Sequence, residues 1–97
     1  MTVTKATSAE IDNFLQYHTH WTTADGMLQR TFTFRTFREA FGFMTEVALV
    51  AECTNHHPEW GNVYNKITVQ LTTHDAGGIT QKDFDLAHQM DSIASRR

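Results

Sequence analysis

Three stretches of the chain carry apolar residues at the spacing of an amphipathic helix. The first begins near Ser8, a suitable N-cap, and ends near Tyr17. The second follows Thr36-Phe37-Arg38-Glu39, which matches a capping box, and ends near Asn55. The third follows Thr80-Gln81-Lys82-Asp83, which can cap a helix in the same way. The apolar positions are Ile11, Phe14 and Leu15, then Phe37, Ala40, Phe41, Met44, Val47, Ala48 and Ala51, and finally Phe84, Ala87, Met90 and Ala94.

Between these helices the side chains alternate, as in strands that bury one face. Residues 28–34 alternate in this way, and Asp25-Gly26 just before them is a strong hairpin signal, so 21–24 should pair with 27–34. A second hairpin is predicted from 59–64 and 67–73, with Asn65-Lys66 as its loop. We expect the five phenylalanines at 32, 34, 37, 41 and 43 to be mostly core.

The resulting order of elements is α-β-β-α-β-β-α. Adjacent strands favour hairpins, so we predict the α+β class, with a four-stranded antiparallel sheet and three helices packed on one face. At 97 residues and 40% hydrophobic content, residues 1–97 should form a single domain.

Charge and cysteine content exclude several classes of protein. The formal net charge is −3 and the eight basic residues are scattered, which argues against binding nucleic acid or an anionic membrane. Cys53 is the single cysteine, so no internal disulfide can form. We interpret Cys53 as a buried small residue. No apolar run reaches the roughly 18 residues that span a bilayer, and the start lacks a secretion signal. We expect a cytoplasmic protein.

The candidate chemistry lies in the run Glu52 to Trp60, where His56 and His57 precede the only proline. Histidine can donate or accept a proton near neutral pH. Pro58 biases His57 toward an extended backbone, so the pair should lie where a helix passes into a strand. With Tyr64 facing Ile67 in the second hairpin, the predicted register places His57 opposite His74. Three histidines would then meet at one end of the sheet.

Several motifs extend this pattern along the chain. They are Glu52-x-x-x-His56-His57-Pro58-x-Trp60, Tyr64-Asn65-Lys66, Thr73-His74, Asp83, Ala40-Phe41-Gly42-Phe43-Met44 and Trp21. In their order and spacing they resemble the pterin-4a-carbinolamine dehydratases. The resemblance implies dehydration of 4a-hydroxytetrahydrobiopterin, or a related pterin, to the quinonoid dihydropterin and water. It also implies that no metal or organic cofactor is needed.

The resemblance assigns roles to individual residues. His56, His57 and His74 would be the catalytic acid and base groups, in a division that the sequence leaves open. Glu52 and Asp83 would support them by orienting the imidazoles. Contacts to the pterin would come from His56-His57-Pro58, from Thr73-His74-Asp75-Ala76 and from Trp60 as part of the pocket wall. Ala76 departs from family members that carry cysteine there, which removes any role for a thiol at this position.

Other interpretations stay open. The histidines could be ordinary helix-end residues, Asp83 could only cap its helix, and Glu52 could be a solvated carboxylate. Three histidines could also bind zinc, although adjacent histidines suit that geometry poorly, and elemental analysis would decide. The fold could serve a non-catalytic dimerisation or assembly partner. The small core and the resemblance both favour a homodimer or homotetramer, with a pterin as the small-molecule partner.

Overall fold

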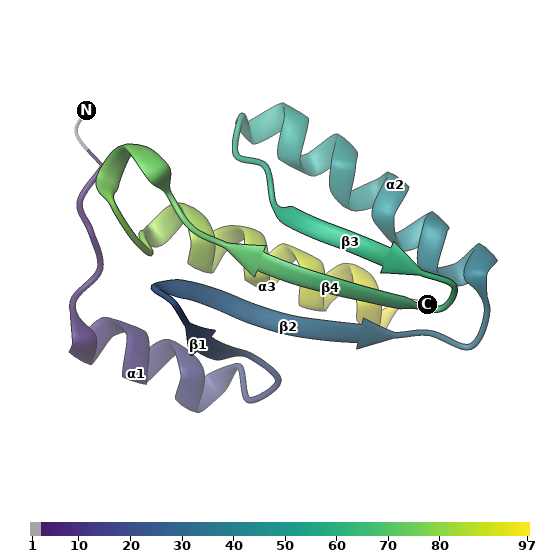
Figure 1. Ribbon diagram of the computed structural model, residues 1–97, viewed down its shortest axis with the longest axis horizontal. Coiled ribbons are helices and arrows are strands. Elements are labelled where there is room, and N and C mark those ends of the chain that lie inside the picture. Colours follow the sequence, from purple (N-terminus) through teal and green to yellow (C-terminus); the bar gives the residue numbers. More distant parts are fainter. Residues whose placement is uncertain (1–2) are drawn as a thin grey trace.

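The computed structural model describes residues 3–97, and its elements follow the predicted order. Three helices and four strands form a single compact domain (Figure 1). The elements are α1 (Ser8–Tyr17), β1 (Thr22–Ala24), β2 (Met27–Thr33), α2 (Phe37–Thr54), β3 (Glu59–Val63), β4 (Lys66–Leu71), a short 3₁₀ helix η1 (His74–Ala76) and α3 (Gln81–Ser95).

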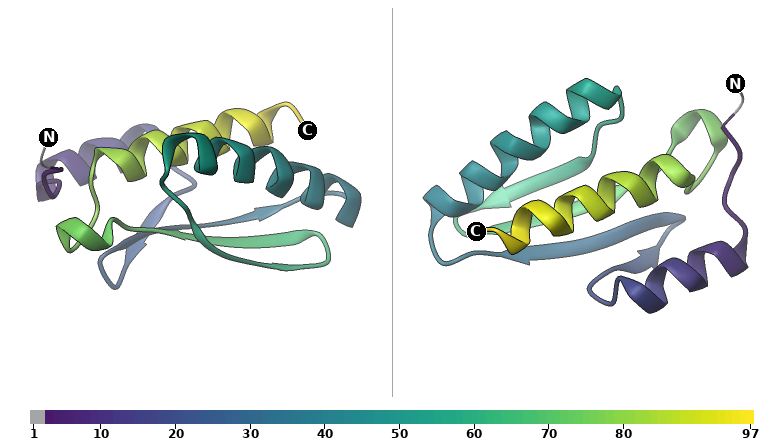
Figure 2. Two further views of the ribbon diagram at one scale, coloured as in Figure 1. Left: turned by 90° about the horizontal axis from the view of Figure 1, so that it is seen from above. Right: turned by 180° about the vertical axis from the view of Figure 1, so that it is seen from behind.

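The four strands form one antiparallel sheet in the order β1-β2-β4-β3. All three helices lie on one face of this sheet, which the left view of Figure 2 shows from the side. Because β3 and β4 are antiparallel, the start of β3 and the end of β4 lie at the same end of the sheet. The turn that enters β3 and the loop that leaves β4 are therefore neighbours.

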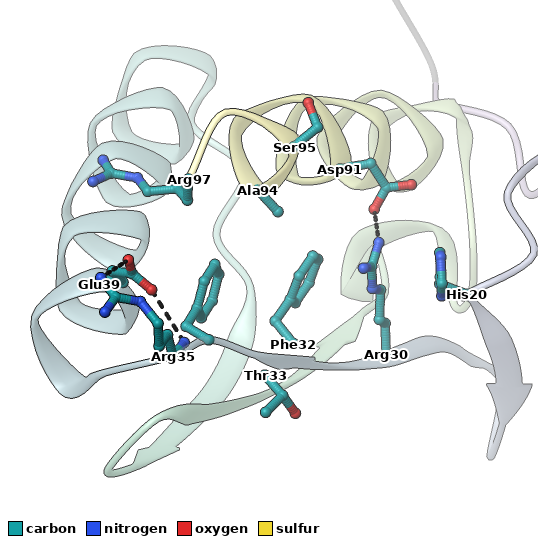
Figure 3. Close-up of a pocket in the computed structure, with 11 residues that line it drawn as sticks. His20, Arg30, Phe32, Thr33, Arg35, Glu39, Asp91, Ala94, Ser95 and Arg97 are labelled. Atoms are coloured by element: carbon teal, nitrogen blue, oxygen red, sulfur yellow. Dashed lines mark hydrogen bonds and ion pairs between the residues drawn. The ribbon is translucent and has the colours of Figure 1, made fainter.

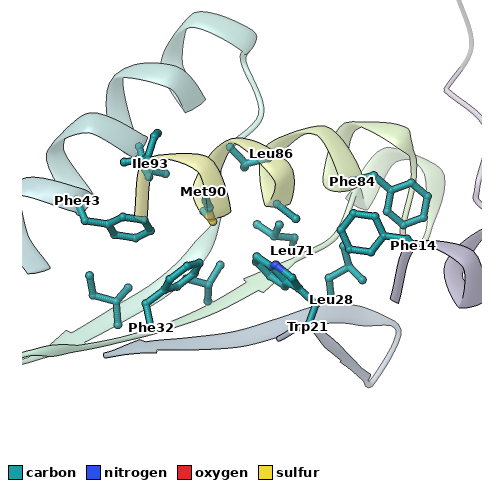
Figure 4. Close-up of a cluster of buried hydrophobic side chains, with 14 of the residues drawn as sticks. Phe14, Trp21, Leu28, Phe32, Phe43, Leu71, Phe84, Leu86, Met90 and Ile93 are labelled. Atoms are coloured by element: carbon teal, nitrogen blue, oxygen red, sulfur yellow. The ribbon is translucent and has the colours of Figure 1, made fainter. Parts of the chain in front are cut away.

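The core fills the space between the sheet and the helices (Figure 4). Leu28 and Phe32 of β2 alternate with exposed or half-buried residues, so only one face of the strand is buried. The ring of Phe32 lies 4.7 Å from the ring of Phe43 on α2, measured between centroids. The inner strand β4 contributes Ile67, Val69 and Leu71, and α3 contributes Phe84, Leu86, Ala87, Met90 and Ile93.

The helix starts agree with the predicted positions but differ in their caps. Thr7, and not Ser8, is the N-cap of α1, because the Thr7 hydroxyl accepts from the backbone of Glu10 and the Glu10 carboxylate accepts from the backbone of Thr7. In α2, Thr36 accepts from the backbone of Glu39 as predicted. The Glu39 carboxylate instead accepts from the backbone and side chain of Arg35, so only half of the capping box forms.

The expectation of a mostly buried phenylalanine set is wrong for two members. Phe37 and Phe41 are 46% and 55% exposed, whereas Phe43 is fully buried. The side chains of α2 that reach the core are Ala40, Phe43, Val47 and Ala51, whose spacing of three and four residues defines one helix face. Phe41 lies outside this face. Cys53, expected to be buried, is exposed as well.

The register of the second hairpin also differs from the prediction. Trp60 pairs with Val69, and Val63 pairs with Lys66, so the loop is Tyr64-Asn65 and the register is shifted by two residues. A shift of two keeps every side chain on the same face, so the hydrophobic pattern could not reveal it. The Asn62 amide donates to the backbone oxygens of Tyr64 in the loop and of Lys66 just after it, and so holds this turn. His57 is therefore not opposite His74.

Within residues 3–97, every helix is too short or too polar to span a bilayer.

Candidate functional site

The site begins where α2 ends. Asn55 adopts the left-handed conformation, with φ of 53°, which asparagine tolerates better than most residues. The backbone N–H of His56 then donates to the carbonyl of Ala51 at 3.0 Å. This closure reverses the chain at the end of the helix. It turns the His56 side chain toward the start of α3.

His56 meets Asp83 there, in a contact that the sequence did not assign to a particular histidine. The Nε2 atom of His56 lies 2.6 Å from Oδ1 of Asp83. Asp83 is fully buried, and the His56 side chain is only 12% exposed. The other carboxylate oxygen, Oδ2, accepts from the backbone N–H of Thr80 and from the hydroxyl of Thr73, each at 2.9 Å. Asp83 therefore caps its helix and holds an imidazole at the same time.

His57 and His74 are also paired with carboxylates, but these pairs are exposed. Nε2 of His57 lies 2.9 Å from Oε1 of Glu52, a residue of the last turns of α2. Nε2 of His74 lies 3.7 Å from Oε1 of Glu59, at the start of β3. Solvent screens such pairs, so each stabilises its geometry far less than the buried pair does. Of the three histidines, His56 is held most firmly.

The loop from residue 73 to residue 78 is tied at its base. Thr73 and Gly78 exchange backbone hydrogen bonds of 3.0 and 3.3 Å, which closes the loop around η1. Gly77 has φ of 76°, a conformation that favours glycine. The closure places His74 and Asp75 in solvent and leaves Ala76 half-buried, whereas the Thr73 side chain is buried.

Two further residues of the predicted site lie at the start of β3. Pro58 and Trp60 are half-buried, and Trp60 packs against the hydrophobic core. The ion pair between His74 and Glu59 shows that the loop after β4 approaches this strand. The structure thus gathers the predicted residues at one end of the sheet, with a different pairing from the one expected.

A cavity of about 390 Å³ adjoins His56, between the end of α2 and the start of α3. Sequence reasoning missed its α3 residues. Lys82, Asp85 and Gln89 recur at helical spacing and so share a face, but nothing in that pattern shows that the face looks toward His56. The full lining is Val50, Thr54, His56, Lys82, Asp85, Leu86, His88 and Gln89.

A larger cavity, of about 610 Å³, lies over β2 and holds none of the predicted site residues (Figure 3). Phe32 and Phe34 line it, as do three arginines. Each arginine is already paired with a carboxylate, so little free positive charge remains for a ligand. The pairs are Arg30 with Asp91, Arg35 with Glu39, and Arg97 with Glu46.

Among residues 3–97, no group of three histidine, cysteine or acidic side chains is arranged to hold a metal ion. The chemistry that these side chains offer is proton transfer. Imidazoles held by carboxylates can donate to one atom of a bound molecule and accept from another.

The chain is similar to known proteins over almost its whole length. A sequence model of the family described as pterin 4 alpha carbinolamine dehydratase matches residues 4–93. A Solibacter usitatus protein, whose own naming as a pterin-4-alpha-carbinolamine dehydratase is provisional, is 54% identical over 92 residues, covering 95% of this chain and 97% of that protein. A Prochlorococcus marinus protein with the same provisional name is 50% identical over 93 residues, or 96% of this chain and 97% of that protein.

Solved structures place the fold in the same group. A transcriptional coactivator/pterin dehydratase from Brucella melitensis superposes with a TM-score of 0.90 at 40% identity, over 93% of this chain and 98% of that one. A pterin dehydratase-like RuBisCO assembly factor of the α-carboxysome shares the fold, with a TM-score of 0.64 at 20% identity, over 76% of this chain and 86% of that one. From the family match and these relatives, the chain belongs to the pterin-4-alpha-carbinolamine dehydratase family.

Proposed function

We propose that this protein catalyses the dehydration of a pterin 4a-carbinolamine, such as 4a-hydroxytetrahydrobiopterin, by histidine acid–base catalysis. Membership of the family supports a dehydratase role. The observation that carries the histidine mechanism is the buried contact between His56 and Asp83 at the end of the sheet that also bears His57 and His74. A largely buried, carboxylate-held imidazole beside a cavity is suited to moving a proton to or from a bound molecule.

The proposed reaction needs two proton transfers. One group donates a proton to the 4a-hydroxyl, the carbon–oxygen bond breaks, and the hydroxyl leaves as water. A second group takes the proton from the neighbouring ring nitrogen. The electron pair of that nitrogen–hydrogen bond then forms the new carbon–nitrogen double bond. The products are the quinonoid dihydropterin and water, so no electrons are gained or lost. The three histidines supply enough groups for both transfers.

A stopped-flow assay of carbinolamine dehydration tests this proposal. The carbinolamine is generated in the instrument, and its decay is followed by absorbance with and without the protein. We expect the decay to accelerate in proportion to protein concentration and to saturate with substrate. A decay equal to the buffer rate at every protein concentration would reject the proposal.

The exposed pair of His57 with Glu52 should matter much less than the buried pair. We expect Glu52→Gln to lower kcat by less than about fivefold, because an exposed ion pair contributes at most about 1 kcal/mol. Asp83→Asn, measured in the same assay, should cost at least about tenfold, because it removes the charged partner of a buried imidazole. Equal losses in the two variants would contradict this ranking of the pairs.

A second candidate function is a non-catalytic partner role. The names of two relatives support it, since one is called a transcriptional coactivator as well as a pterin dehydratase and the other a RuBisCO assembly factor. The stopped-flow assay separates the two roles. A protein that served only as a partner would leave the carbinolamine decay unchanged.

We infer that the protein assembles into a homo-oligomer through the outer face of α2. Phe41 and Leu49 on this face are 55% and 69% exposed. They lie four residues on either side of Thr45, so a second antiparallel copy of α2 centred there would place Phe41 against Leu49 in both directions. This self-complementarity favours a second copy of the chain as the occupant.

Light scattering coupled to size exclusion tests the assembly. We expect a mass of at least two chains for the wild type and a lower mass for Leu49→Glu, because the charge would be buried in the interface. Val63→Glu is the control, since Val63 is at least as exposed, at 79%, but lies in β3. A wild-type mass of one chain would rule out the assembly.

A further inference from the structure

The carboxylate of Asp83 has two oxygens with separate partners. Oδ2 accepts from the backbone N–H of Thr80 and from the hydroxyl of Thr73, and Oδ1 faces Nε2 of His56. All the groups around Oδ2 are buried, with Thr73 7% exposed and both Thr80 and Asp83 fully enclosed. The two hydrogen bonds to Oδ2 therefore fix the position of the carboxylate independently of its contact with His56 through Oδ1.

The two threonine hydroxyls form a chain with one direction. An ionised carboxylate can only accept, so the single hydroxyl proton of Thr73 is donated to Asp83. The hydroxyl oxygens of Thr73 and Thr80 lie 2.8 Å apart, and Thr80 must therefore be the donor between them. Thr80 in turn accepts from the backbone N–H of Lys82 in the first turn of α3. Every proton in this chain points toward Asp83.

The Asp83 carboxylate, as an acceptor, also determines which nitrogen of His56 carries a proton. With Oδ1 of Asp83 as an acceptor at 2.6 Å, the neutral imidazole keeps its proton on Nε2. Nδ1 then holds the free electron pair, and the hydrogen bond through Nε2 is the one that the His56 ring makes among residues 3–97. The atom that can exchange a proton with a bound molecule is Nδ1.

We propose that Thr73 and Thr80 are positioning residues, whose hydroxyl chain fixes Asp83 so that His56 presents Nδ1 as its proton-exchanging atom. This inference rests on the proposed function for its catalytic meaning, but its geometry can be tested separately. It gives Thr73 a role through Asp83 in place of the direct substrate contact that the sequence suggested. Thr80, predicted only as a helix cap, belongs to the same chain of hydrogen bonds.

Nitrogen-15 NMR of the wild-type protein tests the geometry without any substrate. The long-range proton–nitrogen spectrum of a neutral histidine distinguishes the two tautomers, and the signals of His56 are identified by their loss in His56→Gln. We expect the Nε2–H form for His56. The Nδ1–H form in the folded wild type would overturn the inference.

The same spectrum and the stopped-flow assay are then applied to Thr73→Val, which removes the hydroxyl at nearly constant size. We expect a mixture of His56 tautomers and a fall in kcat of about 10- to 100-fold with little change in KM, since a small displacement of a catalytic group is costly. Thr73→Ser should restore both the wild-type tautomer of His56 and the wild-type kcat. Thr72→Val is the control, since Thr72 is half-buried and adjacent, and should leave both unchanged.

Two results would overturn the positioning role. One is a Thr73→Val protein with the wild-type tautomer and kcat, and the other is a Thr73→Ser protein that loses as much as Thr73→Val. If Thr73→Val does not fold, Thr73→Cys gives the same comparison with Thr73→Ser, because a thiol is a weak donor. If the wild type has no dehydratase activity, the proposed function fails, and the tautomer of His56 in these variants alone decides the positioning role.

Discussion

Replacing His56 by alanine is expected to lower kcat for carbinolamine dehydration by about 10²–10⁴-fold, the usual contribution of a general acid or base. His56 is the most firmly held of the three histidines, because Asp83 contacts it in a buried position and the Asn55 turn directs it toward α3. Binding should be less affected than turnover, since His57, Pro58 and the η1 loop remain in place. Stopped-flow measurement of kcat and KM gives both values.

His20→Ala is the matched control for this change. His20 is an exposed histidine between α1 and β1, away from the end of the sheet that carries the site. Its removal should leave kcat within about twofold of the wild type, as expected for a surface substitution. If His56→Ala kept the wild-type kcat, the assignment of His56 to the chemistry would be wrong.

Replacing Asp83 by alanine is expected to lower the free energy of unfolding by about 3 kcal/mol or more. The change removes the acceptor of three hydrogen bonds, which come from the Thr73 hydroxyl, the Thr80 N–H and His56 Nε2, and the first two of these bonds are fully buried. Each hydrogen bond to a charged group contributes about 1.5–3 kcal/mol. In a domain of this size the loss corresponds to a fall in Tm of roughly 12–24 °C, measurable by circular dichroism.

Asp85→Ala provides the comparison for this stability measurement. Asp85 is on the same helix, two residues later, but it is exposed and its carboxylate accepts from the exposed Gln81 amide. Its removal should cost less than about 1 kcal/mol. A similar Tm for Asp83→Ala and Asp85→Ala would show that the buried network contributes little to the fold.

The fold could be predicted because its signals are local. The period of the apolar residues changes from helix to strand and back, and Asp25-Gly26 and Asn55 mark boundaries by their backbone preferences. The structure has both Asp25 and Asn55 at positive φ, as those preferences require. The capping box of α3, with Thr80 and Asp83, forms in full. Class, order and approximate limits of the elements followed from these residues alone.

Tertiary details could not be obtained in this way. The hairpin register was wrong by two residues, because a shift of two preserves the buried face and the contacts of the Asn62 side chain are not visible in a pattern. Helical spacing placed Phe41 with the apolar residues of α2, but a helix turned slightly on its axis buries Phe43 and exposes Phe41. Propensity does not fix such a rotation; packing does.

The candidate site, too, could be predicted only in part. Its residues could be named from their order in the chain and the resemblance, and the end of the sheet where they gather follows from the antiparallel hairpin. Which carboxylate holds which histidine could not be predicted, because Asp83 and His56 are 27 positions apart and meet only when α3 packs beside α2. Lys82 and Gln89 in the adjoining cavity depend on the same packing.

The most direct test of the central claim compares the wild type with the variant that carries His56→Ala, His57→Ala and His74→Ala, in the stopped-flow dehydration assay. We predict saturable acceleration of carbinolamine decay by the wild type and a rate close to buffer alone for the triple variant, provided that circular dichroism shows both proteins folded. Acceleration by the folded triple variant at the wild-type rate, or no acceleration by the wild type, would contradict the account.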